Sequence, residues 1–383
     1  MKEAVKYFEK IYIIPADTGF LGTEENVPHE KITFVDLDNY TAKNNRFVTA
    51  WFRFNVLFKT IVYAVSNKKL NFLSPASLSY EFAYLKKIAG LQSKFEIFIG
   101  SLEKKSFYAY CYWFDIWPLI LSKTNIKNKF SRIISRAHGF DIFPEQQKHK
   151  FDPYFNIKYK SIDLLSSVSL KGKSTLDAKL HTTKNKIIHS NLGVAGNADT
   201  IQLVERGTLL IVSCSIITEL KRVFLIPEIL KSLKVDYKWV HFGTGSAEDV
   251  SIVKKAIEKY KVNGELKGYI SNSDLMKFYK EHTVNLFINV SSSEGIPYSI
   301  MEAMSFGIPC MATNVGGNSE IVDQNNGFLI PADFDPETAA NYINELSLET
   351  QNSMRKKAFE CREEKFNAER NYKTFYRLLI GSN

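Results

Sequence analysis

The C-terminal half of the sequence alternates short apolar runs with longer amphipathic segments. The apolar runs are rich in β-branched residues and predict strands at 208–214, 237–243, 265–270, 285–290, 308–314 and 327–330. Segments with helical periodicity lie between them, at 221–234, 247–260, 273–281, 298–306 and 317–323. This alternation predicts a parallel, doubly wound α/β sheet, in which the loops after the strands bind ligands. Pro227 falls inside the first helix and predicts a kink there.

The N-terminal half shows the same alternation less regularly. Its apolar runs predict strands at 10–16, 31–37, 96–100, 107–113, 132–138 and 163–169. We interpret the stretch 187–200 as the crossing into the second domain. We therefore expect one Rossmann-like domain at 1–192, a second at 193–366, and a basic helix at 367–383 that returns to the first domain.

Length and composition fit a folded protein of two domains. The chain has 383 residues, 45% of them hydrophobic and 24% charged. No segment approaches the ~18–20 uncharged apolar residues that cross a bilayer, and the polar N-terminus lacks a signal-peptide core. The cysteines are scattered without a CxxC pair, which favours a reducing cytoplasm and argues against structural zinc; they are Cys111, Cys214, Cys310 and Cys361.

Charge is distributed unevenly. Residues 1–190 carry 29 Lys and Arg against 17 Asp and Glu, a net charge of +12, whereas residues 191–383 carry 21 against 24, a net charge of −3. The sign change favours domains with different partners, although a solvated basic surface would look the same. In 51–72, aromatic residues interleave with Arg53, Lys59, Lys68 and Lys69 at helical spacing. We favour peripheral contact with anionic lipid at the inner face of the cell membrane; a buried helix with a basic edge is the alternative.

Two glutamates stand out in SSSEGIPYSIMEAMSFGIPC (291–310). Glu294 lies in the loop after a predicted strand, and Glu302 lies inside the helix that Pro297 begins. The side chain of Glu302 is expected to point back toward the helix start, so both carboxylates can flank one ligand. A carboxylate can accept two hydrogen bonds from a ribose diol. Taken alone, the pair is also consistent with a helix cap and an ordinary helical glutamate.

The wider context resembles the retaining glycosyltransferases of family four, which have the two-domain GT-B fold and use nucleotide-sugars. The resemblance is closest over 208–331. It rests on the E-x7-E pair, AMSFGIPCMATNVGGNSEIV after it, KR at 221–222, HFGTG at 241–245, GYISNSDLMKFY at 268–279 and NGFLI at 326–330. Upstream, YCYWFDIW (110–117), SRAHGFDIFPE (135–145) and VSLKGKSTL (168–176) are similar to segments of bacterial members that build surface polysaccharides.

The resemblance implies a role for each matching residue. Glu294 and the backbone of Gly295, Ile296 and Pro297 would contact the donor sugar and its phosphates, and Glu302 the ribose hydroxyls. Lys221, with Arg222 beside it, would bind the diphosphate, and His138 would face the sugar from across the interdomain cleft. Gly243 and Gly245 would let the backbone turn near the nucleotide, while Tyr269 and Ile270 would stack on the base. No metal or other cofactor is expected.

The sequence departs from the family pattern in two places. Ile216 stands where the family usually has an Arg five residues before Lys221, so one phosphate contact is missing. The family also opens with a strand, a Gly-rich loop and a helix before a segment similar to FEKIYIIP, which this chain reaches at 8–15. We therefore expect the first strand and loop to be absent and the N-terminal domain to be shortened.

We accordingly predict a hexosyltransferase that moves a sugar from a nucleotide-sugar, with UDP or GDP favoured, to a glycan or lipid-linked glycan. The C-terminal domain would bind the donor and the N-terminal domain the acceptor. The alternatives are a GT-B epimerase, a catalytically impaired GT-B protein that binds nucleotide-sugar or scaffolds a membrane assembly, and a basic nucleic-acid binder. The last is disfavoured because the sequence has no recognisable nucleic-acid motif.

Overall fold

The computed structural model describes residues 3–16, 29–40, 54, 57–58, 60–62, 65, 74–103, 106–122, 127–143, 152–180, 186–196 and 201–381. The chain divides into two compact units. Unit 1 comprises 1–167, 175–189 and 372–383, and unit 2 comprises 168–174 and 190–371. The division of roles expected for 1–192, 193–366 and 367–383 stays a prediction.

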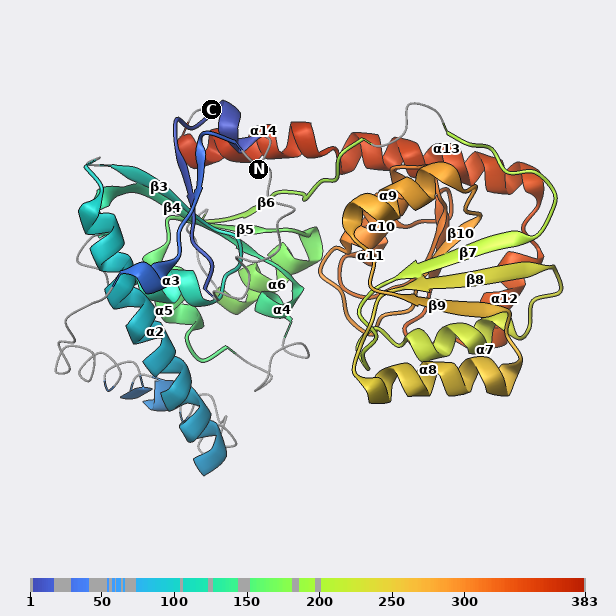
Figure 1. The fold of residues 1–383 in the computed structure, drawn as a ribbon, viewed down its shortest axis with the longest axis horizontal. Helices are drawn as coiled ribbons and strands as arrows, with labels where there is room; N and C mark the ends of the chain where they lie inside the picture. The colour runs from blue at the N-terminus through green and yellow to red at the C-terminus, as the bar shows by residue number, and fades with distance from the viewer. Residues whose placement is uncertain are drawn as a thin grey trace. The chain divides into compact units, whose positions relative to one another are not determined.

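Unit 2 is built on a six-stranded parallel sheet (Figure 1). In spatial order its strands are β12 (Gly327–Ile330), β11 (Cys310–Thr313), β10 (Leu286–Asn289), β7 (Leu209–Cys214), β8 (Tyr237–Phe242) and β9 (Gly264–Gly268). Every neighbouring pair is parallel, which confirms the predicted α/β class. All residues of β10 and β11 are buried, as strands covered on both faces require.

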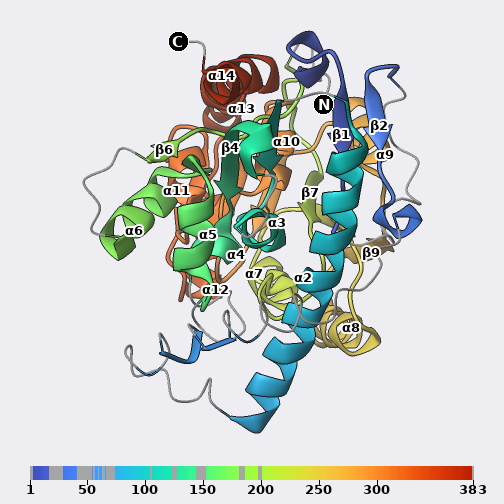
Figure 2. The ribbon, with the colours of Figure 1, turned by 90° about the vertical axis from the view of Figure 1, so that its left-hand side faces the viewer.

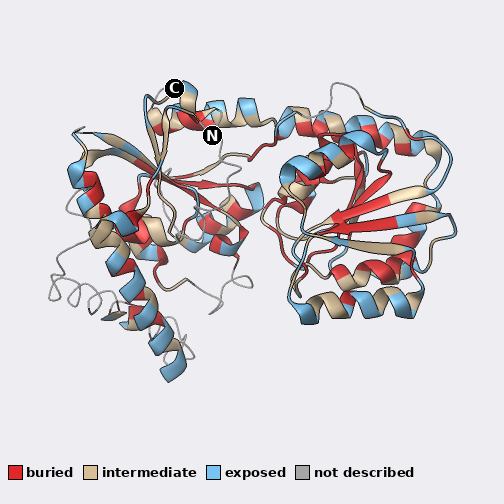
Figure 3. Cartoon of the chain, viewed as in Figure 1, coloured by how far each residue is buried: buried red, intermediate tan, exposed pale blue. Residues whose placement is uncertain are grey.

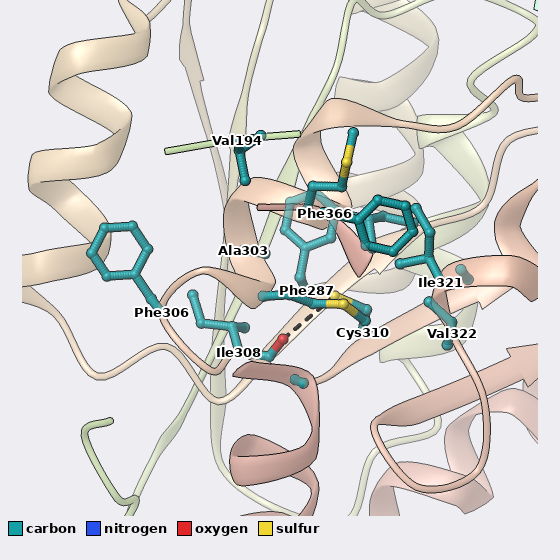
Figure 4. Packing of buried hydrophobic residues seen from close by; sticks show 14 of the residues in the cluster. Val194, Phe287, Ala303, Phe306, Ile308, Cys310, Ile321, Val322 and Phe366 are labelled. Atoms are coloured by element: carbon teal, nitrogen blue, oxygen red, sulfur yellow. Dashed lines mark hydrogen bonds between the residues drawn. The ribbon is translucent and has the colours of Figure 1, made fainter. Parts of the chain in front are cut away.

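Helices cover both faces of this sheet (Figure 1). One face packs against α7 (Ile226–Leu230), α8 (Ala247–Tyr260) and α12 (Pro336–Asn344). The other packs against α9 (Asn272–Glu281), α10 (Tyr298–Met304), α11 (Asn318–Ile321) and α13 (Leu348–Lys365). Figure 4 shows this second cluster around Phe287 of β10, and in Figure 3 the strands at the middle of the sheet are buried.

Unit 1 contains a smaller parallel sheet in the order β3 (Phe107–Cys111), β4 (Phe130–Ala137), β5 (Leu164–Ser167) and β6 (Ile187–His189). A separate parallel pair joins β1 (Ile11–Ile13) to β2 (Ile32–Phe34). The main core of the unit includes residues of α2 (Pro75–Ser101), α3 (Ile116–Leu121), α5 (Phe155–Ser161) and α6 (Leu170–Leu180). Figure 2 shows α2 running past α3, against which it packs.

A second cluster in unit 1 joins the sheet to the C-terminal helix α14 (Ala368–Ile380). Phe375, Tyr376 and Leu379 pack on Ile134 and Leu164, which come from β4 and β5. The remaining short helices are α4 (Gly139–Ile142) and the 3-10 turns η1 (Ala4–Lys6), η3 (Leu37–Asn39), η5 (Lys127–Lys129) and η7 (Val223–Leu225).

The predicted strand at 96–100 is wrong, because these residues belong to α2. Ser74 caps that helix by accepting a hydrogen bond from the backbone N–H of Ser77, and Pro75 occupies its first turn. The buried side chains recur at helical spacing, as Leu85, Ile88, Ala89, Phe95 and Ile99 do. A short apolar run such as 96–100 does not distinguish a strand from one turn of a longer buried helix.

The predicted helix at 221–234 is also shorter than expected. Arg222 has a left-handed backbone (φ 48°), so a turn separates Lys221 from the 3-10 turn η7 and from α7. Pro227 lies in the first turn of α7 and therefore introduces no kink. The segment 187–200, interpreted as a crossing, contains the strand β6.

Among the described residues, no helix is both long enough and apolar enough to span a membrane.

Candidate active site

A pocket opens at the carboxyl ends of β7 and β10, which are neighbours in the sheet of unit 2. From β7 the chain continues to β8 on one side, whereas β10 leads to β11 on the other. The two following loops therefore separate, and ligands of doubly wound sheets bind at such a switch point. The pocket is lined by Ser213, Cys214, Ser215, Lys221, Val223, Ile226, Ile288, Asn289, Val290 and Ser291.

The structure brings Lys221 and Glu294 together beside this pocket. The Lys221 ammonium lies 2.7 Å from Oε1 of Glu294. The same oxygen accepts hydrogen bonds from the Ser291 hydroxyl (2.6 Å) and the Asn289 amide (3.2 Å). Within the described part of the chain no donor bonds Oε2. Glu294 is only 6% exposed, so these donors offset the cost of burying its charge.

Arg222 does not face the pocket with Lys221. Its guanidinium donates to three backbone carbonyls, those of Val290 (2.7 Å), Ser291 (3.1 Å) and Ala332 (2.8 Å). These carbonyls follow β10 and β12, so Arg222 ties together two loops at the edge of the sheet. Arg222 thus supports the loop of Glu294, and its contact with a phosphate stays a prediction.

Glu302 lies in α10 and accepts a hydrogen bond from the Asn272 side chain (2.6 Å). Burial raises the pKa of the Glu302 carboxyl, and the Asn272 hydrogen bond opposes that rise. Asn272 begins α9, the helix that follows β9. The hydrogen bond thereby joins Glu302 to the start of α9. The candidate base-stacking residues lie just before this helix, in the loop after β9.

The loops after β7 and β8 run side by side beyond the sheet. The N–H of Ser215 donates to Phe242 and that of Ile217 donates to Thr244. A Cβ at Gly243 would lie 1.8 Å from the Ser215 carbonyl, and a Cβ at Gly245 would lie 2.2 Å from that of Ile217. Both positions therefore require glycine because of close backbone approach, which is a role beyond the turn predicted from sequence.

A buried polar chain lies under these loops. The Trp239 indole donates to the Ser213 hydroxyl (2.9 Å), which lies 2.8 Å from Nδ1 of His241. The hydroxyl can donate to an unprotonated Nδ1 or accept from a protonated one. Burial lowers the pKa of His241 to about 4. His241 is thus a neutral structural residue at the start of HFGTG.

The two candidate base-stacking residues have different surroundings. Tyr269 is 80% exposed, so its ring is accessible directly after β9. Ile270 is partly buried and packs against the apolar cluster that also contains α9 and α10. An exposed aromatic ring can stack on a nucleotide base.

The backbone beside Glu294 is held by a glycine pair that sequence reasoning did not single out. Gly316 has a left-handed backbone (φ +52°), and a Cβ there would lie 1.7 Å from the Glu294 carbonyl oxygen. The N–H of Gly317 donates to the carbonyl of Gly295 (2.9 Å). Its own Cβ would lie 2.7 Å from Ile296. The consecutive glycines in NVGGN were the available signal.

Pro297 takes the N-cap position of α10 rather than its first turn, and the helix ends before Gly307 (φ +68°). Thr313 supports the same region, because its hydroxyl donates to the Ser291 carbonyl (2.6 Å). Ile216 is 65% exposed on the loop after β7, so the position where the family has an Arg faces solvent.

His138 belongs to unit 1, where it precedes α4. Its Nε2 lies 3.1 Å from the carbonyl of Tyr112. Because a carbonyl only accepts, Nε2 carries the proton and Nδ1 is an acceptor. Burial, with a smaller contribution from Arg136, lowers the pKa of His138 to about 4, so the ring is neutral. Its predicted role toward a sugar bound elsewhere stays a prediction.

No group of three or more His, Cys, Asp or Glu side chains within the described ranges is arranged to hold a metal ion. The positive charge on this pocket comes from Lys221. The arrangement can bind a polar, anionic ligand beside a partly satisfied carboxylate.

Comparison with known proteins identifies this region. Residues 200–361 match the family model described as glycosyl transferases group 1. They form a glycosyltransferase group 1 domain. The match contains the strands of unit 2 and every predicted site residue except His138.

The chain is similar to proteins named for bacterial polysaccharide biosynthesis. It is 26% identical over 212 residues to the putative colanic acid biosynthesis glycosyltransferase WcaL of Escherichia coli, covering 52% of each chain. The chain thus spans about half the length of this curated relative.

Solved structures show the fold. HepE of Anabaena, in complex with UDP and glucose, has a TM-score of 0.63 at 14% identity and covers 77% of this chain and 82% of its own. The pneumococcal O-GlcNAc transferase GtfA, in complex with UDP and GlcNAc, has a TM-score of 0.61 at 18% identity, with coverages of 76% and 60%. These likenesses confirm the GT-B fold.

We predict that Gly316→Ala destabilises the group 1 domain. The left-handed backbone alone costs a residue with a Cβ about 1–2 kcal/mol, and the contact with the Glu294 carbonyl adds to it. Urea unfolding should show a loss of at least about 2 kcal/mol. Gly207→Ala is the matched control, because nothing lies within 4 Å of the added Cβ. Equal stability of the two variants would contradict this account of the glycine pair.

Stability should also depend on pH through His241. The folded pKa (about 4) lies below that of a free histidine (~6.5), so the unfolded chain binds more protons between these values. With respect to His241 the protein is therefore fully stable above pH ~6.5. As the pH falls toward 4, protonation of this residue in the unfolded chain lowers the free energy of unfolding by up to about 3 kcal/mol.

Urea titrations between pH 4 and 7 should show a shallower pH slope for His241→Gln than for the wild-type protein. The exposed His282, replaced by Gln, is the control and should retain the wild-type slope. An unchanged slope in His241→Gln would show that His241 is not the titrating group.

Proposed function

We propose that this protein is a retaining glycosyltransferase of family four that transfers a hexose-type sugar from a UDP- or GDP-sugar to a glycan or lipid-linked glycan. The reaction would serve cell-surface polysaccharide biosynthesis. The observation that carries the proposal is the Lys221–Glu294 pair at the switch point of a group 1 domain. The names of WcaL, HepE and GtfA support the substrate classes, because two of these proteins bind UDP and one belongs to polysaccharide synthesis.

Lys221 would neutralise the departing diphosphate. Its ammonium has three N–H donors and gives one to Glu294. The others can bind phosphate oxygens, whose charge increases as the bond to the anomeric carbon breaks. This proposal assigns no role to a metal. Because Arg222 is engaged with backbone carbonyls, the fixed charge at the phosphates depends mainly on Lys221.

Glu294 would orient the transferred sugar. Its Oε1 is held by three donors, and Oε2 can accept from a sugar hydroxyl. In the proposed reaction the acceptor oxygen bonds the anomeric carbon on the face from which the diphosphate leaves. The leaving phosphate takes the acceptor proton, so no side-chain base is required. Glu302 would bind the ribose hydroxyls, and the exposed Tyr269 would stack on the base.

A second candidate is a catalytically impaired GT-B protein that binds nucleotide-sugar without transferring it. The exposed Ile216 supports this alternative, since a phosphate-binding Arg is missing there. Thermal shifts with UDP, GDP, ADP and CMP would identify the nucleotide in either case. Only the enzyme would release nucleoside diphosphate from the matching nucleotide-sugar.

We predict that Glu294→Gln and Lys221→Ala each reduce transfer at least about 100-fold, as the loss of a transition-state charge contact does. The assay would follow labelled UDP- and GDP-hexoses onto an extract of lipid-linked glycans. Lys238→Ala is the control, because it breaks an exposed ion pair with Glu265 (3.4 Å) in the same sheet. Full activity in both site variants, with the fold intact, would refute the assignment.

We also propose that unit 1 makes peripheral contact with an anionic membrane from the cytoplasmic side. Arg53, Lys59, Lys68 and Lys69, on which this prediction rests, lie outside the described residues. The support comes from the net charge of +12 over residues 1–190 and from a described apolar stripe. The helical residues of this stripe are 48–65% exposed; they are Phe54, Phe58, Val62 and Val65.

Replacing Phe54 and Phe58 together by Ser should reduce co-sedimentation with phosphatidylglycerol vesicles at least tenfold, because two exposed aromatic side chains are lost from the interface. The transfer rate onto a soluble acceptor should stay the same. Tyr342→Ser, an exposed aromatic position in unit 2, is the control. Unchanged vesicle binding by the double variant would contradict a membrane role for this stripe.

A further inference from the structure

Exposed aromatic side chains gather where β3 and β4 end in unit 1. Tyr112 and Trp113 follow β3, and Phe140 lies in α4, directly after β4. Their exposed fractions are 39%, 47% and 40%. The ring centroids of Tyr112 and Trp113 lie 5.2 Å apart, and those of Trp113 and Phe140 lie 6.2 Å apart. We call these three residues the aromatic platform.

Buried hydrogen bonds hold the loops that carry the platform. The Asp141 carboxylate is 4% exposed and accepts from the N–H of Phe114 (3.3 Å) and of His138 (2.8 Å), which joins one loop to the other. The Ser135 hydroxyl donates to the Trp113 carbonyl (3.2 Å). The platform is therefore ordered before any ligand binds, which reduces the entropy lost on binding.

The geometry of the rings suits a sugar. The Tyr112 and Trp113 planes meet at 73°, and the Trp113 and Phe140 planes at 68°. In each edge-to-face contact the positive edge of one ring meets the negative face of the other. The exposed fractions of 39–47% leave part of each ring accessible to a ligand. A pyranose presents C–H groups on one face, which match a negative ring face, and hydroxyls around its rim. His138 packs against Tyr112, with ring centroids 4.9 Å apart.

We propose that the aromatic platform binds a pyranose ring of the acceptor glycan. This inference rests on the proposed function, because only a glycosyltransferase requires a glycan acceptor. The platform lies at the carboxyl ends of parallel strands, where doubly wound domains bind their ligands. Its three side chains are uncharged, whereas an anionic membrane surface would be matched by basic residues.

The direct test is saturation-transfer NMR of the full chain with methyl glycosides of glucose, galactose and N-acetylglucosamine. If a glycoside stacks on the platform, saturation should be transferred strongly to the C–H protons of one of its faces. We expect this for at least one of the three glycosides. Trp113→Ala and Phe140→Ala should each weaken that signal roughly tenfold, and Trp113→Phe should retain most of it. In the transfer assay the same alanine variants should raise the acceptor KM about tenfold with little change in kcat.

Tyr108→Ala is the matched control, because this ring on β3 is 43% exposed and contacts Phe8, which is not in the platform. Wild-type signals in Trp113→Ala and Phe140→Ala would overturn the inference. The inference would also be overturned if none of the three glycosides received saturation transfer. It would be overturned as well if the platform residues were required only for binding to phosphatidylglycerol vesicles. Failure of the proposed function would look different, since no nucleotide-sugar would then release its nucleoside diphosphate while glycosides still bound the platform.

Discussion

The candidate site exists because the chain leaves two neighbouring parallel strands in opposite directions. β7 leads to β8 on one side and β10 leads to β11 on the other, so the loops after these two strands separate at the carboxyl edge of the sheet. The Lys221 loop and the Glu294 loop are then joined across this gap by an ion pair of 2.7 Å. Most other features of the site, including the glycines and the buried hydrogen bonds, fix the positions of these two loops.

The adjacent basic residues of the KR pair have different functions in the structure. A left-handed backbone at Arg222 turns its side chain toward the carbonyls of Val290, Ser291 and Ala332, while Lys221 remains at the pocket. Arg suits the first task because its planar group makes several directed hydrogen bonds. Lys suits the second because its ammonium can share donors between a carboxylate and a ligand. Lys and Arg are therefore not interchangeable at these two positions, although both carry a positive charge.

The sequence was sufficient to predict the sheet of unit 2, because strands such as β10 and β11 are buried on both faces and read as continuous apolar runs. The same criterion wrongly predicted a strand at 96–100, where one turn of α2 also consists of a short apolar run. The positions of Lys221 and Glu294 beyond the carboxyl ends of the strands were also predictable, since both follow recognisable strands. The destination of the Arg222 side chain was not, because it depends on a backbone dihedral angle. The need for Gly316 depends on contact with a loop distant in sequence.

The boundary between the two units does not correspond to a single cut in the chain. Residues 168–174 belong to unit 2 although they precede 175–189, which belong to unit 1. Within unit 2, the Glu320 carboxylate accepts from the N–H groups of Leu170 (2.8 Å) and Lys171 (2.9 Å). A fragment beginning at Ser190 would lack these donors. Unit 2 therefore keeps these contacts only if residues 168–174 are retained, so a truncation at Ser190 would remove part of the unit being isolated.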